Sequence, residues 1–301
     1  MRVVYRSDHI EASNIPFSSV QNPATISNRK IMSTDRPMST KIHPTAIVDE
    51  KAQLGHDVEI GPYTVVGPDV KIGDRTKCRS HVIIEGHTTI GADCDIYPFV
   101  SLGTEPQDLQ YKGEPTELRI GHNNIIREYV TMNRASNKDD GITQVGNHGM
   151  FMIGIHIAHD CKIGDYIVMA NQASMGGHVH IGDYVILGGL AAIHQFVHIG
   201  EHAMIGGMSR VANDVIPFGM ARGPSAHLTG LNLVGLRRRG FDREEIFELR
   251  KAYRLLFVDE GTMEDRLYNT ESMFSDSEPV MRLIDFIRTE SSRSLMTEKT
   301  V

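Results

Sequence analysis

Several features that mark other protein classes are scarce in this chain of 301 residues. Its 3 cysteines, Cys78, Cys94 and Cys161, form no CxxC pair, no paired zinc spacing and no even set for disulfides. We therefore expect a reducing, cytoplasmic environment. No apolar run approaches the roughly 20 residues that cross a bilayer, which excludes a transmembrane protein.

Positive charge is also in short supply, since 31 Lys and Arg face 38 Asp and Glu for a formal net charge of -7. Binding to phosphate backbones needs a basic surface, so non-specific nucleic-acid binding is excluded. Residues 1–41 lack the apolar core of a secretory signal and have weak apolar patterning. We expect this segment to be a disordered extension, or translation from too early a start, with Met38 opening the patterned sequence.

What the sequence does contain is a period of six. An apolar residue stands at every sixth position from Ile42 to Leu102, from Ile120 to Met132 and from Val145 to Val211. All 26 positions of this apolar ladder are occupied by apolar residues, and glycine follows about half of them. Composition alone would produce far fewer of both, so the period is a structural signal.

A period of six fits neither an α-helix nor a long simple strand, but it is typical of hexapeptide repeats that build a parallel β-helix. With three hexapeptides in each coil, residues 18 apart should lie above one another at the strand spacing of about 4.8 Å. We predict a mainly β fold, with this β-helix over residues 42–216. Its interruptions at 103–119 and 133–144 are loops that carry function or merely decorate the surface.

The pattern changes after Val211. Asp242 and Glu245 have the spacing of a capping box before an amphipathic stretch, and a second helical stretch covers residues 279–288. We predict a small C-terminal α-helical domain over residues 217–301. Its arginines, including Arg237, Arg238 and Arg239, form either a solvated helix face or a site for an anionic partner such as a nucleotide diphosphate or an acidic carrier protein.

The coil arithmetic sorts the histidines between residues 148 and 202. His159, Gly177 and Gln195 are spaced by 18 and should form one column, with Asp160 and His178 in the adjoining column. A neutral histidine can deprotonate a hydroxyl, a carboxylate can orient it, and a backbone N–H can stabilise an oxyanion. A single histidine taken alone is more simply a solvated or structural residue, but the stacked column with an acid beside it fits acyl transfer equally well.

A metal site is the rival interpretation. His180 and His198 are separated by one full coil, and imidazoles on neighbouring coils could bind zinc between subunits. The matching position one coil earlier is Lys162, so no third ligand suggests itself.

Four stretches narrow the function: residues 107–121, 155–165, 176–200 and 230–241. Through them the chain resembles the bacterial UDP-N-acetylglucosamine O-acyltransferases, hexapeptide-repeat enzymes that begin lipid A biosynthesis. The resemblance covers residues 42–256 and implies a left-handed β-helix and a homotrimer with sites between subunits. It also implies transfer of a 3-hydroxyacyl chain from acyl carrier protein to the 3-hydroxyl of UDP-N-acetylglucosamine, with no metal and no organic cofactor.

The resemblance also assigns residues. It implies that His159 is the general base, that Asp160 orients it and that the Gly177 backbone donates to the oxyanion. Contacts with the sugar or the acyl chain are implied for Asp108, His156 and His178. Positions near the nucleotide and the acyl chain are implied for His194, Gln195, Asn232 and Arg238.

Three positions leave the substrate open. Gln110 stands where the family often has Lys, Asn133 stands where well-known members have His, and Gly207 matches a position that gates the depth of the acyl chain. The alternatives are the same transfer to a 3-amino sugar, an acetyl-CoA-dependent hexapeptide transferase, and a β-helix scaffold without catalysis. A glycine at position 207 predicts room for a long acyl chain.

Overall fold

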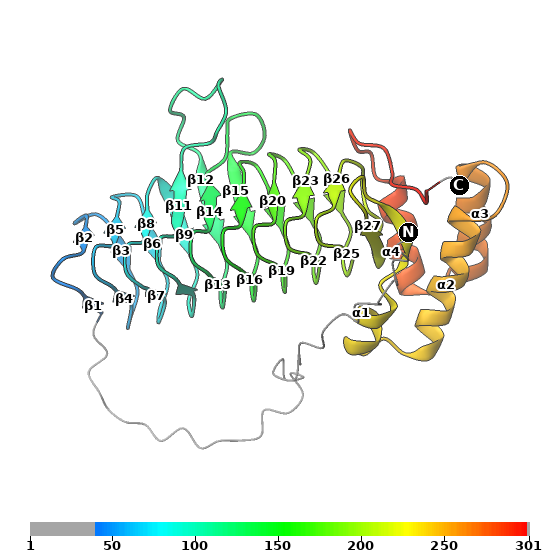
Figure 1. Cartoon of the computed structure of the whole chain (residues 1–301), viewed down its shortest axis with the longest axis horizontal. Coiled ribbons are helices and arrows are strands. Elements are labelled where there is room, and N and C mark those ends of the chain that lie inside the picture. Colours follow the sequence, from blue (N-terminus) through cyan, green and yellow to red (C-terminus); the bar gives the residue numbers. More distant parts are fainter. Residues whose placement is uncertain (1–39, 300–301) are drawn as a thin grey trace, which may run out of the picture. The chain divides into compact units, whose positions relative to one another are not determined.

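The computed structural model describes residues 40–299, and the predicted N-terminal extension lies almost wholly outside them. Three sheets of short strands form the three walls of a prism (Figure 1). The first sheet contains β1 (Lys41–Ile42), β4 (Glu59–Ile60), β7 (Lys77–Cys78), β10 (Asp95–Ile96), β13 (Ile125–Ile126), β16 (Met150–Phe151), β19 (Val168–Met169), β22 (Ile186–Leu187), β25 (Met204–Ile205), β27 (Gly219–Arg222) and β28 (His227–Leu231). The second sheet contains β2 (Ile47–Val48), β5 (Val65–Val66), β8 (Ile83–Ile84), β11 (Ser101–Thr104), β14 (Thr131–Asn133), β17 (His156–Ile157), β20 (Ser174–Met175), β23 (Ala192–Ile193) and β26 (Arg210–Val211). The third sheet contains β3 (Gln53–Leu54), β6 (Lys71–Ile72), β9 (His87–Ile90), β12 (Glu117–Ile120), β15 (Ile142–Val145), β18 (Lys162–Ile163), β21 (His180–Ile181) and β24 (His198–Ile199).

The chain visits the three sheets in turn, so strands one coil apart pair in parallel, and only the last pair of the first sheet, β27 and β28, is antiparallel among the described strands. In the second sheet Ile157 pairs with Met175, and Met175 pairs with Ile193, at the predicted spacing of 18. These ladder residues point into the prism and are buried, as are nearly all the others beyond the first coil. Parallel sheets bury one face against a common core, so the six-residue apolar period is the sequence counterpart of this core.

The corners of the prism have an unusual backbone. A non-glycine residue with φ between 56° and 66° stands three positions after the ladder residue at most corners. Such left-handed residues cost about 1–2 kcal/mol each, and at one corner stacking offsets part of that cost. There Tyr184 stacks between Tyr166 and His202 with ring centroids 4.7 Å away on both sides. Corner side chains therefore point outward in columns that follow the prism axis.

Two loops leave the prism at one corner. Ile96 pairs with Ile126, and Ile120 pairs with Val145, so both separations exceed the regular coil and extra residues are extruded. The extra residues follow β11 and β14 of the second sheet, and Figure 1 shows both loops projecting from the same edge. The register resumes after each loop, because the pairing of the strands on either side is uninterrupted.

Four helices follow the prism: α1 (Leu233–Arg238), α2 (Arg243–Phe257), α3 (Met263–Phe274) and α4 (Glu278–Arg288). The capping box at α2 is present, since the Asp242 carboxylate accepts the Glu245 N–H and the Glu245 carboxylate accepts the Asp242 N–H. A second core forms where Phe218 meets apolar side chains of α1, α2 and α4. The predicted boundary at residue 216 precedes β27 and β28, which extend the first sheet to Leu231. None of the described helices is long and apolar enough to cross a membrane.

His202 is the buried histidine in the stack with Tyr166 and Tyr184, and it predicts that acid lowers the stability of the fold. Burial, with the positive charges of Arg239 and Arg282, lowers the pKa of His202 to about 3. An unfolded histidine has a pKa of about 6.5, so only the unfolded chain takes up this proton between those values. The neutral, buried His202 therefore makes its full contribution to the free energy of unfolding above about pH 6.5. As the pH drops from there toward about 3, this contribution is lost by up to about 1.4 kcal/mol per pH unit.

We therefore expect His202→Phe to keep the ring stacking and reduce the loss of stability on acidification. Urea unfolding at pH 7 and pH 5 measures this difference. His148→Phe is the matched control, because His148 stacks on Tyr166 in the same column but is exposed. Equal acid sensitivity of the two variants would contradict the prediction.

Candidate active site

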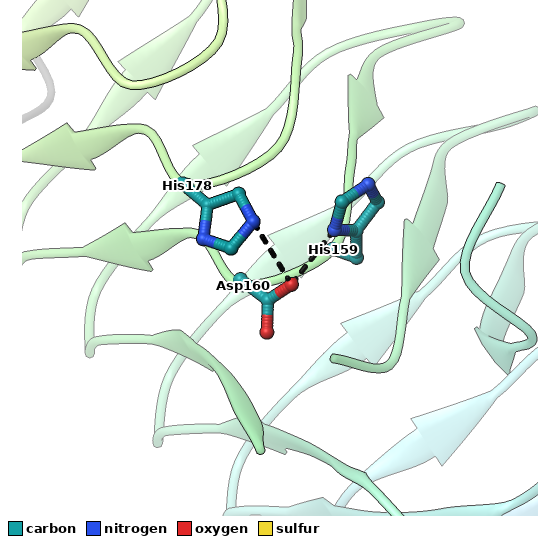
Figure 2. A group of neighbouring side chains, drawn as sticks. All are labelled: His159, Asp160 and His178. Carbon is teal, nitrogen blue, oxygen red and sulfur yellow. Dashed lines mark hydrogen bonds and ion pairs between the residues drawn. The ribbon is translucent and has the colours of Figure 1, made fainter. Parts of the chain in front are cut away.

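Three polar side chains meet at the corner from which the loops leave. His159 and Asp160 follow β17, and His178 follows β20 one coil later (Figure 2). His159 Nδ1 lies 2.7 Å from Asp160 Oδ2, and His178 Nε2 lies 3.5 Å from the same oxygen. Asp160 and His178 both have left-handed backbones, which turn their side chains out of the prism at this corner.

Asp160 is completely buried and firmly held. Its carboxylate accepts hydrogen bonds from the Ser136 hydroxyl at 2.7 Å and from the Ser136 N–H, while its own N–H donates to the Thr143 hydroxyl. Burial alone would raise the pKa of this carboxyl, but the hydrogen bonds from His159 and Ser136 outweigh burial and hold the pKa below its usual value. Asp160 is therefore an anion that can orient a neighbouring imidazole.

The carboxylate fixes the tautomer of His159. An ionised carboxylate can only accept, so the Nδ1–H of His159 donates to Asp160 and the Nε2 lone pair is left free. The side chain of His159 is 15% exposed, so this nitrogen remains open to a substrate. An imidazole with a free Nε2 and an anion behind Nδ1 is suited to remove a proton from a hydroxyl group.

Gly177 lies directly against the imidazole of His159. A Cβ built on Gly177 would stand 2.5 Å from His159 Cε1 and 2.9 Å from Nε2, closer than any side chain tolerates. The backbone N–H of Gly177 donates no hydrogen bond within residues 40–299. At the corner of Tyr166 and Tyr184 some of the equivalent N–H groups are capped, as where Asp165 N–H donates to Asp183 at 2.7 Å. The Gly177 N–H is thus available for a developing oxyanion beside the base.

The two loops are joined to each other and to the site. Lys138 of the second loop forms an ion pair of 2.6 Å with Asp108 of the first. Hydrogen bonds from Lys138 and from the Gln110 N–H lower the pKa of Asp108, with a smaller contribution from the charge of His159. Ser136 of the same loop binds Asp160, so Lys138 and Ser136 together link Asp108 to the group of His159 and Asp160. The Gln110 side chain is exposed.

Asn133 and His156 lie at the bases of these elements. The Asn133 amide is buried and donates to the Thr104 hydroxyl at 2.8 Å and to the Glu105 carbonyl at 2.7 Å, so it braces the first loop. His156 contacts the Thr131 hydroxyl at 2.8 Å. Burial, followed by the charge of His159, lowers the pKa of His156, which keeps this imidazole neutral beside the base.

The remaining predicted residues lie elsewhere in the chain. Gln195 follows β23 in the column of His159 and Gly177, with His194 beside it, and both are exposed. Gly207 follows β25 of the first sheet and lies at a different corner. Asn232 is buried as the N-cap of α1, and Arg238 is exposed in the last turn of that helix. Within one chain the structure therefore does not bring Gly207, Asn232 or Arg238 to His159.

Sequence reasoning missed three contacts around this site. Ser136 binds Asp160, Arg134 donates to the Gly103 carbonyl and the Tyr111 hydroxyl of the first loop, and Arg293 binds the segment of His194. All three come from outside the six-residue ladder, where the coil arithmetic makes no statement. The many polar residues of the second loop are a sequence signal for Arg134 and Ser136, and no such signal marks Arg293.

The side chains of His159, Asp160 and His178 lie close enough together that they could hold a metal ion. Among residues 40–299, only His159, Asp160 and His178 place three ligand atoms close enough for one ion. Their atoms are already joined by the hydrogen bond that sets the tautomer of His159. His180 and His198 stack face to face with centroids 4.5 Å apart and belong to no such group in the described part of the chain.

Comparison with known proteins identifies the family of this chain. Residues 214–296 match the family described as UDP-N-acetylglucosamine O-acyltransferase, domain 2. The acyl-(acyl-carrier-protein)–UDP-N-acetylglucosamine O-acyltransferase of Thermodesulfovibrio yellowstonii is 52% identical over 247 residues, which cover 82% of this chain and 96% of the relative. The protein of that name from Caulobacter vibrioides is 53% identical over 254 residues, covering 84% of this chain and 97% of the relative.

Solved structures give the same result. LpxA from Acinetobacter baumannii superposes with a TM-score of 0.82 at 44% identity, covering 85% of this chain and 99% of that one. The predicted fold class, a left-handed parallel β-helix with a small helical C-terminal part, is confirmed by this agreement. The chain belongs to the UDP-N-acetylglucosamine O-acyltransferase family.

Proposed function

We propose that the His159 site transfers a 3-hydroxyacyl chain from acyl carrier protein to the 3-hydroxyl of UDP-N-acetylglucosamine, the first step of lipid A biosynthesis. The observation that carries the mechanism is the contact of His159 with both Asp160 and Gly177. The imidazole lies 2.7 Å from a buried carboxylate, and it packs against Gly177, whose N–H donates no hydrogen bond within residues 40–299. A base and an oxyanion donor side by side are what acyl transfer requires.

The reaction follows from these positions. Nε2 of His159 takes the proton from the sugar hydroxyl as its oxygen attacks the thioester carbonyl carbon. The carbonyl oxygen becomes an oxyanion that accepts the Gly177 N–H. The tetrahedral intermediate then expels the thiolate of the carrier, which takes the proton from the His159 imidazolium. Asp160 stabilises that imidazolium and keeps it oriented. The substrate contact proposed for His178 would be made beside this pair, since its Nε2 lies 3.5 Å from Asp160 Oδ2.

The basic surface of α1 and α2 supports a carrier protein as acyl donor. Arg237, Arg238, Arg243 and Arg250 are exposed and take part in no ion pair among the described residues. An acidic carrier protein would be attracted to this surface and oriented by it. Acetyl-CoA offers less surface for such a patch to recognise, which makes it the weaker donor candidate.

The distribution of apolar side chains supports a homotrimer. On the first sheet the outward-facing positions are apolar from β13 onward: Ile125, Met150, Val168, Ile186 and Met204. At the adjoining corner Leu190 is 52% and Met208 73% exposed, and Gly207 lies beside them. A closed three-fold ring would cover this surface and bring the Gly207 corner of one subunit to the His159 corner of the next.

The first prediction from the proposed function concerns His159, the proposed base. We expect His159→Ala to lower kcat for acyl transfer by roughly 10²–10⁴-fold, because general-base catalysis contributes about that much. Asp160→Asn should also lower kcat strongly, since an amide can donate to Nδ1 and so favours the wrong tautomer. Transfer from 3-hydroxyacyl carrier proteins to UDP-N-acetylglucosamine, beside its 3-amino analogue and acetyl-CoA, is the assay.

Each outcome of this assay has a distinct meaning. Ester formation that depends on His159 supports the proposal in full. Transfer only to the amino sugar would replace the acceptor, and transfer only from acetyl-CoA would replace the donor. No transfer by a well-folded protein would leave the scaffold interpretation.

The second prediction uses the contact of Gly177 with the base. Gly177→Ala introduces a methyl group 2.5 Å from His159 Cε1, so the imidazole must move away from the oxyanion donor. We expect a loss of kcat of about 10²-fold or more, because a displaced imidazole no longer meets the attacking hydroxyl and general-base catalysis contributes about that much. Gly67→Ala is the control, because its Cβ meets no atom closer than 3.4 Å. Similar activities of the two variants would argue against a base that works in contact with Gly177.

The third prediction concerns assembly. We expect the unmodified protein to have the mass of a trimer and the double variant Leu190→Asp, Met208→Asp to dissociate and lose transfer activity, because charges would be buried in the interface. Light scattering after gel filtration measures the mass, and circular dichroism checks that the prism remains folded. A folded, fully active monomer would overturn the proposed site between subunits.

A further inference from the structure

The C-terminal segment reaches back onto the prism beside the active-site column. Residues 294–298 pair with the prism through isolated bridges, Asp214 with Leu295 and Leu228 with Glu298. The Asp214 N–H donates to the Ser294 carbonyl at 3.0 Å, and the Met296 N–H donates to the Asp214 carbonyl at 2.7 Å. Met296 is buried in the main core. The segment is thus fixed by backbone hydrogen bonds and apolar packing.

This anchoring places Arg293 over two of the predicted substrate residues. Its Nη2 lies 2.7 Å from His194 Nδ1, and its Nε donates to the Gln195 carbonyl at 3.0 Å. His194 is also held by its backbone N–H, which donates to the Val211 carbonyl at 2.8 Å. The Arg293 guanidinium therefore binds both the side chain of His194 and the backbone carbonyl of Gln195.

The chemistry of arginine determines the state of His194. A guanidinium has donors only, so His194 Nδ1 must accept from Arg293 and carries no proton. The Gln195 carbonyl, 3.3 Å from Nδ1, then receives its hydrogen bond from Arg293 and not from His194. The proton of a neutral His194 is consequently on Nε2, the nitrogen that remains free to donate.

The position of this donor fits the acceptor substrate. Gln195 lies two coils from His159 in one column, about 10 Å along the prism axis. A nucleotide sugar whose hydroxyl is at His159 can span that distance with its sugar ring and diphosphate. An N–H donor beside a guanidinium favours the oxygens of a nucleotide diphosphate over a hydrocarbon chain.

We propose that Arg293 is a positioning residue that locks His194 in its Nε2–H tautomer for donation to the nucleotide diphosphate of the acceptor. This inference rests on the proposed function for its substrate. Arg293 acts through His194 and Gln195, and the C-terminal segment becomes part of the acceptor site although it lies far from His159 in the sequence.

Steady-state kinetics with Arg293→Ala and Arg293→Lys tests the substrate side of the proposal. We expect Arg293→Ala to raise the KM for UDP-N-acetylglucosamine by about ten- to a hundredfold, the usual effect of a lost charged hydrogen bond, with a small change in kcat. Arg293→Lys keeps one donor and should give an intermediate KM. Arg288→Ala is the matched control, because Arg288 pairs with Glu271 on the surface of the helices. An unchanged KM in Arg293→Ala, or an equal rise in Arg288→Ala, would overturn the proposal.

A spectroscopic measurement tests the tautomer directly. In the full chain labelled with ¹⁵N-histidine, the His194 signals, assigned by their loss in His194→Gln, should show an unprotonated Nδ1 and a protonated Nε2. Arg293→Ala should convert them to a mixture of tautomers, whereas Arg288→Ala should not. A protonated Nδ1 in the unmodified protein would overturn the assignment. Because this readout needs no turnover, it separates failure of the Arg293 proposal from failure of the proposed reaction.

Discussion

The register of the backbone ladder is the constraint on which the rest of the structure depends. Away from the two loops, parallel strands one coil apart pair in register, so a residue faces the residue 18 positions later at about 4.8 Å. That rule places His159 against Gly177 and Asp160 beside His178, although neither pair is adjacent in sequence. A slip of one residue would turn the ladder side chains outward and separate both pairs. The core and the site are therefore held by the same hydrogen bonds.

The two loops add side chains to the His159 corner without disturbing the pairing of the prism strands. A β-helix tolerates an insertion at a corner, because the strands on either side can resume their pairing. Here two insertions leave the prism at the corner of His159. In the second insertion, the hydroxyl and the N–H of Ser136 both donate to the carboxylate of Asp160. The ion pair of Asp108 with Lys138 then joins the first loop to the second. The prism holds the proposed base and oxyanion donor, and the loops hold the side chains that support Asp160.

Much of this arrangement could be predicted from the sequence. The ladder predicts the coil, and the coil predicts the column of His159, Gly177 and Gln195, because a fixed period converts sequence distance into spatial distance. The same arithmetic separates Gly207 from His159, since Gly207 follows by two coils and two thirds of another, which ends at a different corner. It could not predict Asn133 as a buried brace or Arg293 as a partner of His194. Those contacts depend on loops and a C-terminal segment whose conformations follow from packing and not from a period.

The separation of the His159 corner from the Gly207 corner bears on how the subunits assemble. In one chain the catalytic group of His159 and the exposed apolar side chains around Gly207 lie at different corners, with the second sheet between them. A long acyl chain whose thioester is at His159 cannot leave water by lying on that same chain's apolar corner. A neighbouring subunit presents the missing corner if the interface repeats with three-fold symmetry, because each subunit then offers one corner of each kind to its neighbours. The proposed trimer is thus supported by the separation of the two corners as well as by the exposed apolar surface.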